Sequence, residues 1–512
     1  MTRPLAIDPD ALSIEAIRAG LLADVPVTVL GFARSGIALA RFLGDAGARV
    51  TIYDARPEAD LGDAIAALEG RTVRLALGPE VDPASTWTDA RLVTTSPSIN
   101  PDYPTTEPRL RAALRALVEA GTAGDRSAPA LISEPDLFLR LCVSPTVGVT
   151  GTKGKTTTAS LTAAILAADR AHPVVLGGNI GVPILDRLAE LTPEHRVVYE
   201  LSELQLPTLS RGTTVAVYTN VTSDHLDRHG SVEAYRRAKR ILAERVDPDG
   251  ALVLNGDDRV AASYAGLGTA RRLLYRRGEP ADGEIGVVDG WMVARRVAPL
   301  GGGAPADEPI MPVDELGIPG AHNVSNALAA VAVGLLFGIP GPAIRDAAAA
   351  FTGVEHRLEH VGTVDGVRFI NDSQGTQPDA VIAALEAFPP PVVLIAGGRD
   401  KGVDLSDLGP VVARRAVAAV LIGESGPDLE RRFRDAGLTR TERAATLDEA
   451  VGRADALARE ALADAQPDAA PATVLLSPAA ASFDMFRDYA ARGSAFKDAV
   501  ADLVASRARR RP

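Results

Sequence analysis

The residues best suited to chemistry stand at positions 151–156, which read Gly-Thr-Lys-Gly-Lys-Thr after an apolar run. A helix that begins after such a turn presents free N–H groups and a positive dipole end, which suit a phosphate. Lys155 adds a compact charge that can reach the β- and γ-phosphates, and Thr156 adds a hydroxyl for Mg²⁺. Val149 occupies the first glycine position of the longer phosphate-loop pattern. The stretch predicts an ATP site, and a glycine turn before a buried helix is the alternative.

Lysine is otherwise scarce in this chain. Of the 54 basic residues only five are lysines, namely Lys153, Lys155, Lys239, Lys401 and Lys497. Arginine cannot replace lysine where a point charge or a reactive amine is required. Lys239 stands among arginines in the stretch 231–244, whose pattern predicts a helix. Either it is a chance lysine on a solvated face, or its amine is needed, for example to form a carbamate with CO₂.

Carboxylates and one imidazole follow two further apolar runs. Glu200 ends one run, and Asp224, His225 and Asp227 come just after the other. Side chains at strand ends beside a phosphate loop can hold a divalent cation. His229 has no acidic or thiol partners in a zinc pattern, so we interpret it as a surface or capping histidine.

Among the elements that must position the functional residues, the first along the chain is a βαβ unit near the N-terminus. It consists of a strand at 27–30, a turn at 31–36, a helix at 37–43 and a strand at 50–53. The turn reads GFARSG, with Ala33 in place of the second glycine of G-x-G-x-x-G, and Asp54 could hold a ribose hydroxyl. A nicotinamide-dependent oxidoreductase is an alternative on this turn alone, as is a turn that binds nothing. The oxidoreductase leaves Glu200, His225 and the second glycine loop unexplained.

The remaining elements predict an α/β fold of three domains in series. A second strand–turn–helix begins at Thr146, and the small, polar stretch 121–130 is a plausible linker. After Phe351, short apolar strands alternate with helices, which indicates a parallel sheet covered on both faces. We predict an N-terminal Rossmann-like domain (1–127), a central P-loop ATPase-like domain with a parallel sheet (128–353) and a C-terminal Rossmann-like domain (354–512).

Composition limits the possible partners. The net charge of −12 argues against nucleic-acid binding. A single cysteine, Cys142, fits a reducing compartment. The N-terminus lacks the pattern of a secretory signal, and the longest apolar run, 327–339, is too short for a membrane span and is expected to be a buried helix. We therefore expect a soluble, cytoplasmic protein without a nucleic-acid or membrane partner.

Taken together, the motifs resemble those of the Mur ligase family, ATP-dependent enzymes that form amide bonds in peptidoglycan synthesis. The resemblance covers essentially the whole chain in one order. It includes GTKGKTT (151–157), GGNIGVP (177–183), ELSELQL (200–206), NVTSDHLDRHGSVEAYRRAK (220–239), NGDD (255–258), GAHNVSNALAA (320–330), HRLE (356–359), NDSQGT (371–376), GGRDKG (397–402) and LLSPAAASFDMFRDYAARGSAF (475–496).

The resemblance implies roles for individual residues. For ATP these are Gly151, Thr152, Lys153, Gly154, Lys155, Thr156, Thr157, Asn323, Asn326, Arg357 and Asp372. For two Mg²⁺ ions they are Thr156, Glu200, His225 and Lys239, the last carbamylated in relatives. For the uridine-nucleotide substrate they are Ser35, Asp54, Arg56, Ser96 and Asn179, and for the acceptor amino acid Thr376, Lys401, Ser482 and Tyr489. The residues implied to act in catalysis are Lys155, Lys239, His225 and Lys401.

The implied reaction uses ATP to phosphorylate the alanyl carboxylate of UDP-N-acetylmuramoyl-L-alanine. The amine of glutamate would then attack the acyl phosphate, and a monomer is expected. The last two motifs favour D-glutamate over L-glutamate. Gln374 stands where similar enzymes often have Lys, which leaves the enantiomer open. A second departure is Tyr489, where Phe is familiar. Another amide ligase of the same fold, of the folate or cyanophycin type, is the remaining alternative.

Overall fold

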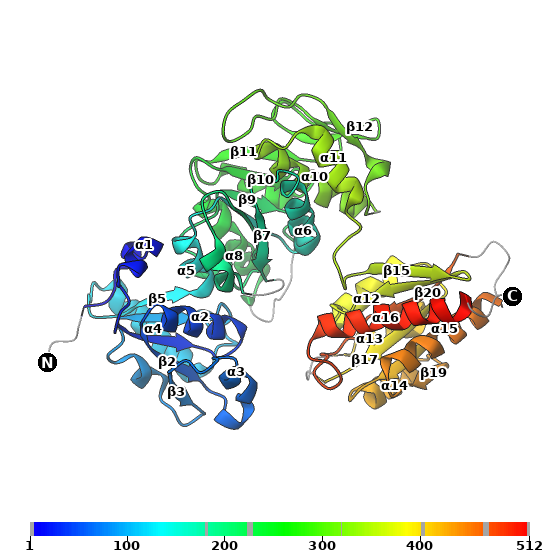
Figure 1. The fold of residues 1–512 in the computed structure, drawn as a ribbon, viewed down its shortest axis with the longest axis horizontal. Helices are drawn as coiled ribbons and strands as arrows, with labels where there is room; N and C mark the ends of the chain where they lie inside the picture. The colour runs from blue at the N-terminus through cyan, green and yellow to red at the C-terminus, as the bar shows by residue number, and fades with distance from the viewer. Residues whose placement is uncertain are drawn as a thin grey trace. The chain divides into compact units, whose positions relative to one another are not determined.

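A computed structural model describes residues 5–179, 183–222, 229–318, 320–400, 405–463 and 470–508. The chain forms three mainly parallel sheets with helices between the strands, which confirms the predicted α/β class (Figure 1). Two compact units contain them, Met1–Phe351 with the first two sheets and Thr352–Pro512 with the third. The boundary expected near residue 127 stays a prediction.

The first sheet has five parallel strands in the order β3-β2-β1-β4-β5. These strands are β1 (Pro26–Leu30), β2 (Arg49–Asp54), β3 (Arg74–Leu77), β4 (Leu92–Thr95) and β5 (Ala130–Ser133). The helices are α1 (Ile14–Arg18), α2 (Arg34–Asp45), α3 (Gly62–Ala66) and α4 (Pro108–Thr122). Neighbouring residues of β1 alternate between two cores, because Val29 packs with α2 and Leu30 with α4. Strand order reverses between β1 and β4, where such sheets bind ligands.

The central sheet has nine strands in the order β14-β13-β12-β11-β10-β9-β6-β8-β7, parallel from β7 to β12 and antiparallel beyond. Its strands are β6 (Thr146–Thr150), β7 (Val174–Gly178), β8 (Arg196–Glu200), β9 (Val215–Tyr218), β10 (Ala251–Asn255), β11 (Arg271–Tyr275), β12 (Ile285–Val288), β13 (Trp291–Ala294) and β14 (Pro309–Pro312). The ends of β6, β8 and β9 therefore meet at one edge.

Among the residues that the structure describes, the helices that accompany the central sheet are α5 (Glu134–Leu141), α6 (Lys155–Leu166), α8 (Val232–Arg245), α9 (Arg259–Ser263), α10 (Ala321–Leu336) and α11 (Gly341–Ala350). Helix α10 packs along α6, and its residues from Asn326 to Leu336 are buried, which confirms the buried helix expected there (Figure 1). One apolar core joins the first and central sheets through side chains such as Phe138 and Tyr199. Within the described residues, no helix is long and apolar enough to span a membrane.

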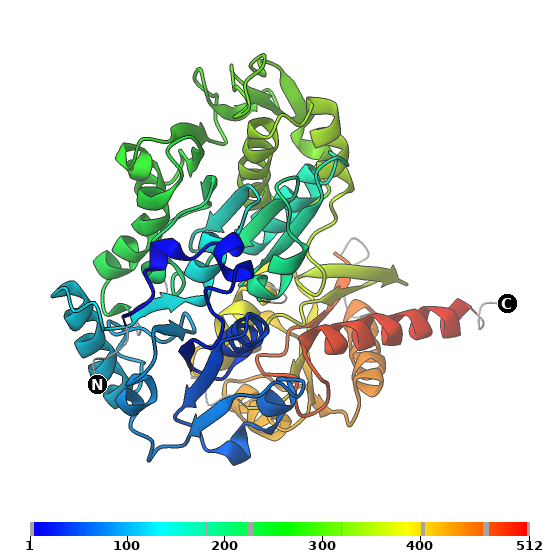
Figure 2. The same ribbon diagram turned by 60° about the vertical axis from the view of Figure 1, so that its left-hand side comes forward.

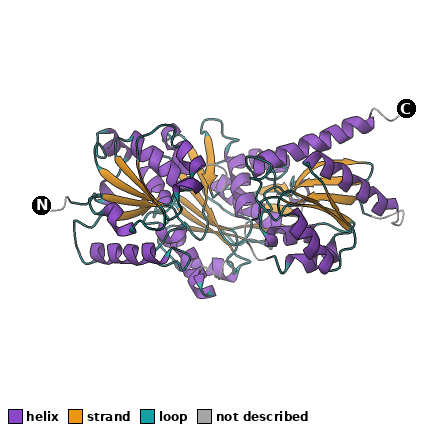
Figure 3. Cartoon of the chain, turned by 90° about the horizontal axis from the view of Figure 1, so that it is seen from below, coloured by secondary structure: helices purple, strands orange, loops and turns teal. Residues whose placement is uncertain are grey.

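The third sheet has six strands in the order β15-β16-β20-β17-β18-β19, with only β15 antiparallel to its neighbour. Its strands are β15 (Glu359–Val364), β16 (Val367–Asn371), β17 (Val392–Gly397), β18 (Ala418–Ile422), β19 (Thr441–Arg443) and β20 (Ala472–Leu476). The helices are α12 (Pro378–Ala387), α13 (Leu408–Arg415), α14 (Gly426–Asp435), α15 (Leu447–Ala463) and α16 (Tyr489–Ala508). They cover both faces of the sheet, and α16 is one continuous helix (Figures 2 and 3).

Two glycines of α2 should respond oppositely to alanine. A Cβ on Gly36 would lie 1.8 Å from the carbonyl oxygen of Gly31, whereas nothing lies within 4 Å of a Cβ on Gly44. We expect Gly36→Ala to destabilise the protein by about 1–3 kcal/mol, because the turn after β1 must move. Gly44→Ala should be neutral or stabilising by up to about 1 kcal/mol. Unfolding midpoints of both variants measure this, and equal midpoints would contradict the close approach.

Candidate active site

The glycine loop between β6 and α6 is shaped by two glycines with positive φ. Gly151 has a φ of 145° and Gly154, the N-cap of α6, has a φ of 84°. A Cβ on Gly151 would lie 2.0 Å from Thr219 Oγ1, and one on Gly154 would lie 2.4 Å from Asn326 Oδ1. Side chains are thus excluded at both positions, and the loop leads into the N-terminus of a twelve-residue helix. This geometry suits a phosphate.

Lys155 and Thr156 open helix α6. The Lys155 ammonium lies over the loop and donates to the carbonyl oxygens of Gly151 at 3.1 Å and Thr152 at 2.9 Å. Both partners are neutral, so the positive charge is left to attract an anion. Thr156 is buried at the second position of the helix. Lys153, in contrast, is exposed, and its backbone N–H donates to Asn220 Oδ1.

Side chains from three other elements hold the loop in place. The Thr152 hydroxyl contacts the Tyr235 hydroxyl on α8 at 2.9 Å and accepts from the Thr222 N–H at 3.0 Å. Asn220, after β9, donates its amide to the Lys153 carbonyl at 2.9 Å. From α10, Asn326 lies against Gly154 and donates to Asn323 Oδ1 at 3.1 Å. The structure therefore brings both predicted asparagines to the loop.

Glu200 lies at the end of β8, beside the end of β6, and is 1% exposed. Its Oε1 accepts from the Asn179 amide at 3.1 Å, and the Glu200 carbonyl accepts from the Asn179 N–H. Its Oε2 is buried without a hydrogen-bond partner among the described residues. A buried carboxylate oxygen left unsatisfied is costly, and a divalent cation would satisfy it.

The other predicted metal ligands are only partly visible. Asp224, His225 and Asp227 lie outside the described residues, as does Lys401. Within the described ranges, no group of three or more His, Cys, Asp or Glu side chains could hold a metal ion. The side chains in place for a cation are therefore Glu200 and Thr156.

Lys239 is fully buried, so its interpretation as a lysine on a solvated face is wrong. Its Nζ donates to the Gly151 carbonyl at 2.9 Å and to Thr150 Oγ1 at 3.2 Å, and lies 3.9 Å from a Glu203 carboxylate oxygen. The amine also stands 5.5 Å from the centre of the Tyr235 ring. Helix α8 thus delivers one amine to the base of the glycine loop.

A cavity of about 300 Å³ opens at the strand-order reversal of the first sheet. Its lining is Gly31, Tyr53, Asp54, Ala55, Ser98, Ile99, Thr105, Thr106, Glu107 and Leu110. Asp54 accepts from the Phe32 N–H at 2.8 Å and from the Arg56 guanidinium at 2.8 and 3.0 Å. Burial acts to raise the pKa of Asp54, but these hydrogen bonds outweigh it and hold the pKa below its usual value.

Two predicted serines lie near this cavity. Ser96 is buried, its hydroxyl has no hydrogen-bond partner in the described chain, and its Oγ lies 3.0 Å from a Cβ built on Gly31. Ser35 lies in the first turn of α2 and is half-buried. The cavity rim therefore offers a hydroxyl, a carboxylate and a guanidinium to a polar ligand.

The loop on the far side of this cavity reaches the central sheet through Tyr103. Its hydroxyl lies 3.4 Å from the carbonyl oxygens of Glu203 and Leu204. Its ring meets His229 edge-on at 5.9 Å, and His229 meets Tyr235 at 5.4 Å. His229 is therefore half-buried between two tyrosines, which corrects the surface part of its interpretation as a surface or capping histidine. Through Tyr235 these contacts continue to the glycine loop.

In the C-terminal unit, the predicted residues gather where β16 and β20 end. Asp372 accepts from Ser477 Oγ at 2.6 Å and from the Leu358 N–H at 3.2 Å. Burial raises the pKa of Asp372 to about 6, and the Ser477 hydrogen bond opposes that rise. Arg357 stands between His356 and Leu358, whose φ values of 62° and 46° are strained for side chains of their size.

Three acceptor-site candidates share this edge. Thr376 follows Asp372 in one loop, Ser482 is buried after β20, and the Tyr489 carbonyl accepts from Ser373 Oγ at 2.7 Å. Gln374 stands where similar enzymes often have lysine, and its side-chain amide donates to the Glu355 carbonyl at 3.1 Å. Its position is therefore occupied by a neutral group tied to the backbone.

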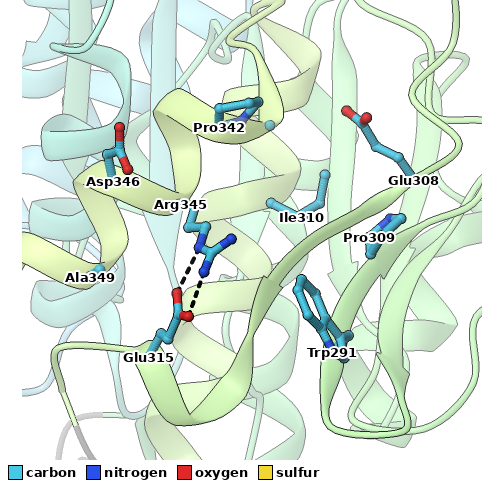
Figure 4. Close-up of a pocket in the computed structure, with 10 residues that line it drawn as sticks. Trp291, Glu308, Pro309, Ile310, Glu315, Pro342, Arg345, Asp346 and Ala349 are labelled. Carbon is cyan, nitrogen blue, oxygen red and sulfur yellow. Dashed lines mark hydrogen bonds and ion pairs between the residues drawn. The ribbon is translucent and has the colours of Figure 1, made fainter.

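A larger cavity than that beside Asp54, about 510 Å³, lies elsewhere on the central sheet (Figure 4). Trp291 forms one wall, and Arg345 pairs with both carboxylate oxygens of Glu315. None of the predicted site residues lines it. Size alone therefore does not identify the site of chemistry.

Sequence reasoning missed three residues that shape the site, namely Asn220, Glu203 and Tyr103. Asn220 stands two residues after β9, so its place near a strand end was a signal that could have been used. Glu203 and Tyr103 gave no local signal, because they act through contacts distant in sequence.

Comparison with known proteins identifies related chains. Residues 149–334 match the model of the Mur ligase middle domain, and residues 356–480 match that of the Mur ligase, glutamate ligase domain. UDP-N-acetylmuramoylalanine–D-glutamate ligase of Symbiobacterium thermophilum is 38% identical over 489 residues, covering 95% of this chain and all of the relative. The enzyme of the same name from Pelotomaculum thermopropionicum is 39% identical over 487 residues, covering 93% of this chain and 97% of the relative.

Solved structures share the fold at lower identity. MurF from Acinetobacter baumannii has a TM-score of 0.51 at 18% identity, covering 89% of this chain and 90% of its own. UDP-N-acetylmuramate-alanine ligase MurC from Thermotoga maritima has a TM-score of 0.50 at 19% identity, covering 93% of this chain and 99% of its own.

A buried carboxyl between the first and central sheets should make stability depend on pH. Burial raises the pKa of Glu134 from the usual 4.5 to about 7, while a weak bond from the Leu185 N–H opposes this. The folded state thus holds the proton more tightly than the unfolded state, so stability falls as pH rises between these values. The gain in unfolding free energy of Glu134→Gln over the wild type should therefore be larger at pH 8 than at pH 5, by on the order of 1–3 kcal/mol.

Denaturant midpoints at both pH values measure this effect. Glu190→Gln is the control, because Glu190 is exposed and paired with Arg187, so it should show no such pH dependence. A Glu134→Gln gain that is equal at pH 5 and pH 8 would contradict the burial of an ionisable group.

Proposed function

The chain belongs to the Mur ligase family, and we propose that it joins D-glutamate to UDP-N-acetylmuramoyl-L-alanine with hydrolysis of ATP to ADP and phosphate. Members of this family are ATP-dependent, ADP-forming amide ligases. The observation that carries the proposal is the glycine loop, whose Gly151 carbonyl accepts from both Lys155 and Lys239, with Glu200 at the neighbouring strand end. Relatives named for D-glutamate addition support the choice of substrate.

The proposed reaction proceeds in two steps. An oxygen of the alanyl carboxylate attacks the γ-phosphorus of ATP. The bond between the γ-phosphorus and the bridging oxygen breaks, and ADP leaves with its electron pair. The glutamate amine then attacks the carbonyl carbon of the acyl phosphate, the tetrahedral intermediate expels phosphate, and the ammonium loses its proton. Lys155 would offset the negative charge that accumulates on the transferred phosphoryl group, helped by the N–H groups of the loop.

Divalent cations fit the same edge of the central sheet. The unsatisfied Oε2 of Glu200 and the hydroxyl of Thr156 would hold Mg²⁺, with His225 as a further ligand. Mg²⁺ would supply charge neutralisation and orientation of the phosphates. Lys239, buried 3.9 Å from Glu203, is the candidate for a carbamate, which would convert a cation at this position into a further anionic ligand.

The substrates are assigned to separate parts of the chain. We assign the uridine nucleotide to the cavity beside Asp54, with Ser35, Arg56 and Ser96, and the muramoyl part of the same substrate to Asn179 beside Glu200. Residues 1–127, 128–353 and 354–512 would then bind nucleotide-sugar, ATP and acceptor respectively, with Asn323, Asn326, Arg357 and Asp372 completing the ATP site. Thr376, Lys401, Ser482 and Tyr489 would bind glutamate. We propose a monomer that acts in the cytoplasm.

Phosphate release from ATP tests this function directly. We expect release that requires both UDP-N-acetylmuramoyl-L-alanine and D-glutamate, with a product heavier than the nucleotide substrate by one glutamyl residue on mass spectrometry. L-glutamate should give a much lower rate. Faster turnover with L-glutamate would reassign the acceptor, and turnover without a uridine nucleotide would point to a different amide ligase.

Substitution in the glycine loop tests the role of its second lysine. Lys155→Ala should lower kcat by about 10³-fold or more, because the phosphoryl charge loses its nearest cation. Lys153→Ala is the matched control in the same loop, since its exposed side chain should cost less than about tenfold. An undiminished rate in Lys155→Ala, measured by phosphate release, would refute the assignment of ATP to this loop.

A further inference from the structure

Arg492, in the first turn of α16, is a buried cation with neutral partners. It is 1% exposed. Its Nε donates to Ser373 Oγ at 3.0 Å and its Nη2 to the Ser373 carbonyl at 2.9 Å. Its Nη1 lies 3.3 Å from the carbonyl oxygens of Ala480 and Ala481. Burial lowers the pKa of Arg492 to about 10, so it stays charged at neutral pH, with Asp484 and Asp372 attracting it from further away.

These partners lie in the segments that carry the acceptor-site candidates. Ser373 belongs to the loop from Asp372 to Thr376, and its hydroxyl passes a hydrogen bond on to the Tyr489 carbonyl. Ala480 and Ala481 directly precede Ser482. A Cβ on Gly398, in the segment after β17, would lie 3.2 Å from Arg492 Nη1. One guanidinium therefore hydrogen-bonds to two segments of the acceptor edge and lies beside a third.

The contact with Ala481 fixes the direction of the next peptide group. The Ala481 carbonyl accepts from Arg492 and, at 2.9 Å, from the Arg399 N–H. In a trans peptide the following N–H points opposite to the carbonyl. The Ser482 N–H is therefore directed away from the guanidinium, at the start of the turn that the Ser482 carbonyl closes with Met485 and Phe486.

Hydrogen bonding alone does not explain a charge at this position. Burying a cation is costly unless an anion compensates for it, and the carbonyl oxygens together with the more distant Asp484 and Asp372 do so only in part. A neutral amide could tie the same loops together at lower cost. A dicarboxylate ligand on the other side of these loops would provide the missing compensation.

We propose that Arg492 is a positioning residue of the acceptor site, which orients the Ser482 peptide and supplies positive potential to the carboxylates of glutamate. It acts through the loops and does not touch the substrate. The inference rests on the proposed function, because glutamate is the dianionic group that the charge would serve.

Steady-state kinetics with each substrate varied in turn test this role. Arg492→Met should raise KM for glutamate by about tenfold or more, while KM for ATP and for the uridine nucleotide changes by less than about twofold. Arg492→Lys keeps the charge but loses the fork, so its KM should lie between those of wild type and Arg492→Met. Ser373→Ala should raise KM for glutamate by about threefold.

Arg415→Met is the matched control for lost packing. Arg415 is half-buried in the same unit and also donates only to carbonyls, those of Leu385 and Phe388 at the C-terminal end of α12, whereas the loop from Asp372 to Thr376 precedes that helix. It should lower the unfolding temperature and leave KM for glutamate unchanged. Similar changes in all three KM values for Arg492→Met and Arg415→Met would overturn the proposal.

Two further outcomes keep the test decisive. If Arg492→Met does not fold, an unchanged KM for glutamate in both Arg492→Lys and Ser373→Ala overturns the inference. Wild-type protein without glutamate-dependent phosphate release would overturn the proposed function as well. Wild-type turnover with an unchanged KM in Arg492→Met would overturn the role of Arg492 alone.

Discussion

The close approach of the glycine loop to two neighbouring segments constrains the rest of the site. Only glycine fits at positions 151 and 154, because Thr219 at the end of β9 and Asn326 on α10 already occupy the space of a side chain. This contact requires β9 beside β6 and α10 against α6, which the sheet order and helix packing supply. Since β8 is the other neighbour of β6, Glu200 comes to the same edge. The strand order that places the glycine loop therefore also places the Glu200 carboxylate.

The cationic side chains at the site differ from those at the surface in the kind of oxygen atom to which they donate hydrogen bonds. Lys155 and Arg492 donate their hydrogen bonds to neutral oxygens, so neither is paired directly with a protein carboxylate. At the surface the opposite holds, as where Arg71 pairs with both Asp45 and Glu69. A reaction that gathers a carboxylate, a triphosphate and an amino acid needs cations that are still available to anions. The half-buried Lys155 and the buried Arg492 meet that need at the cost of desolvation.

Local pattern was sufficient for the fold class and the glycine loop, because both depend on residues close in sequence. The sequence left two interpretations of Lys239 open, because its flanking arginines are typical of a solvated helix. The packing of α8 against the glycine loop decides for burial. His229 failed for a similar reason, because its neighbour Tyr103 comes from the first sheet. Arg492 carried no signal either, since a lone arginine on a helix is usually exposed.

The spacing of contacts along α16 shows how one helix face organises the C-terminal unit. Tyr489 meets the His356 ring edge-on, and the Gly493 carbonyl accepts from Asn371, where a Cβ would collide with His356. Lys497, one turn further, pairs with Glu355 and Glu359 on either side of that histidine. Steps of four residues keep these contacts on one face. Arg492 stands on the same turn as Tyr489 and Gly493. Helix α16 therefore fixes both the strained segment around Arg357 and the acceptor loops. A shift of α16 would disturb both together.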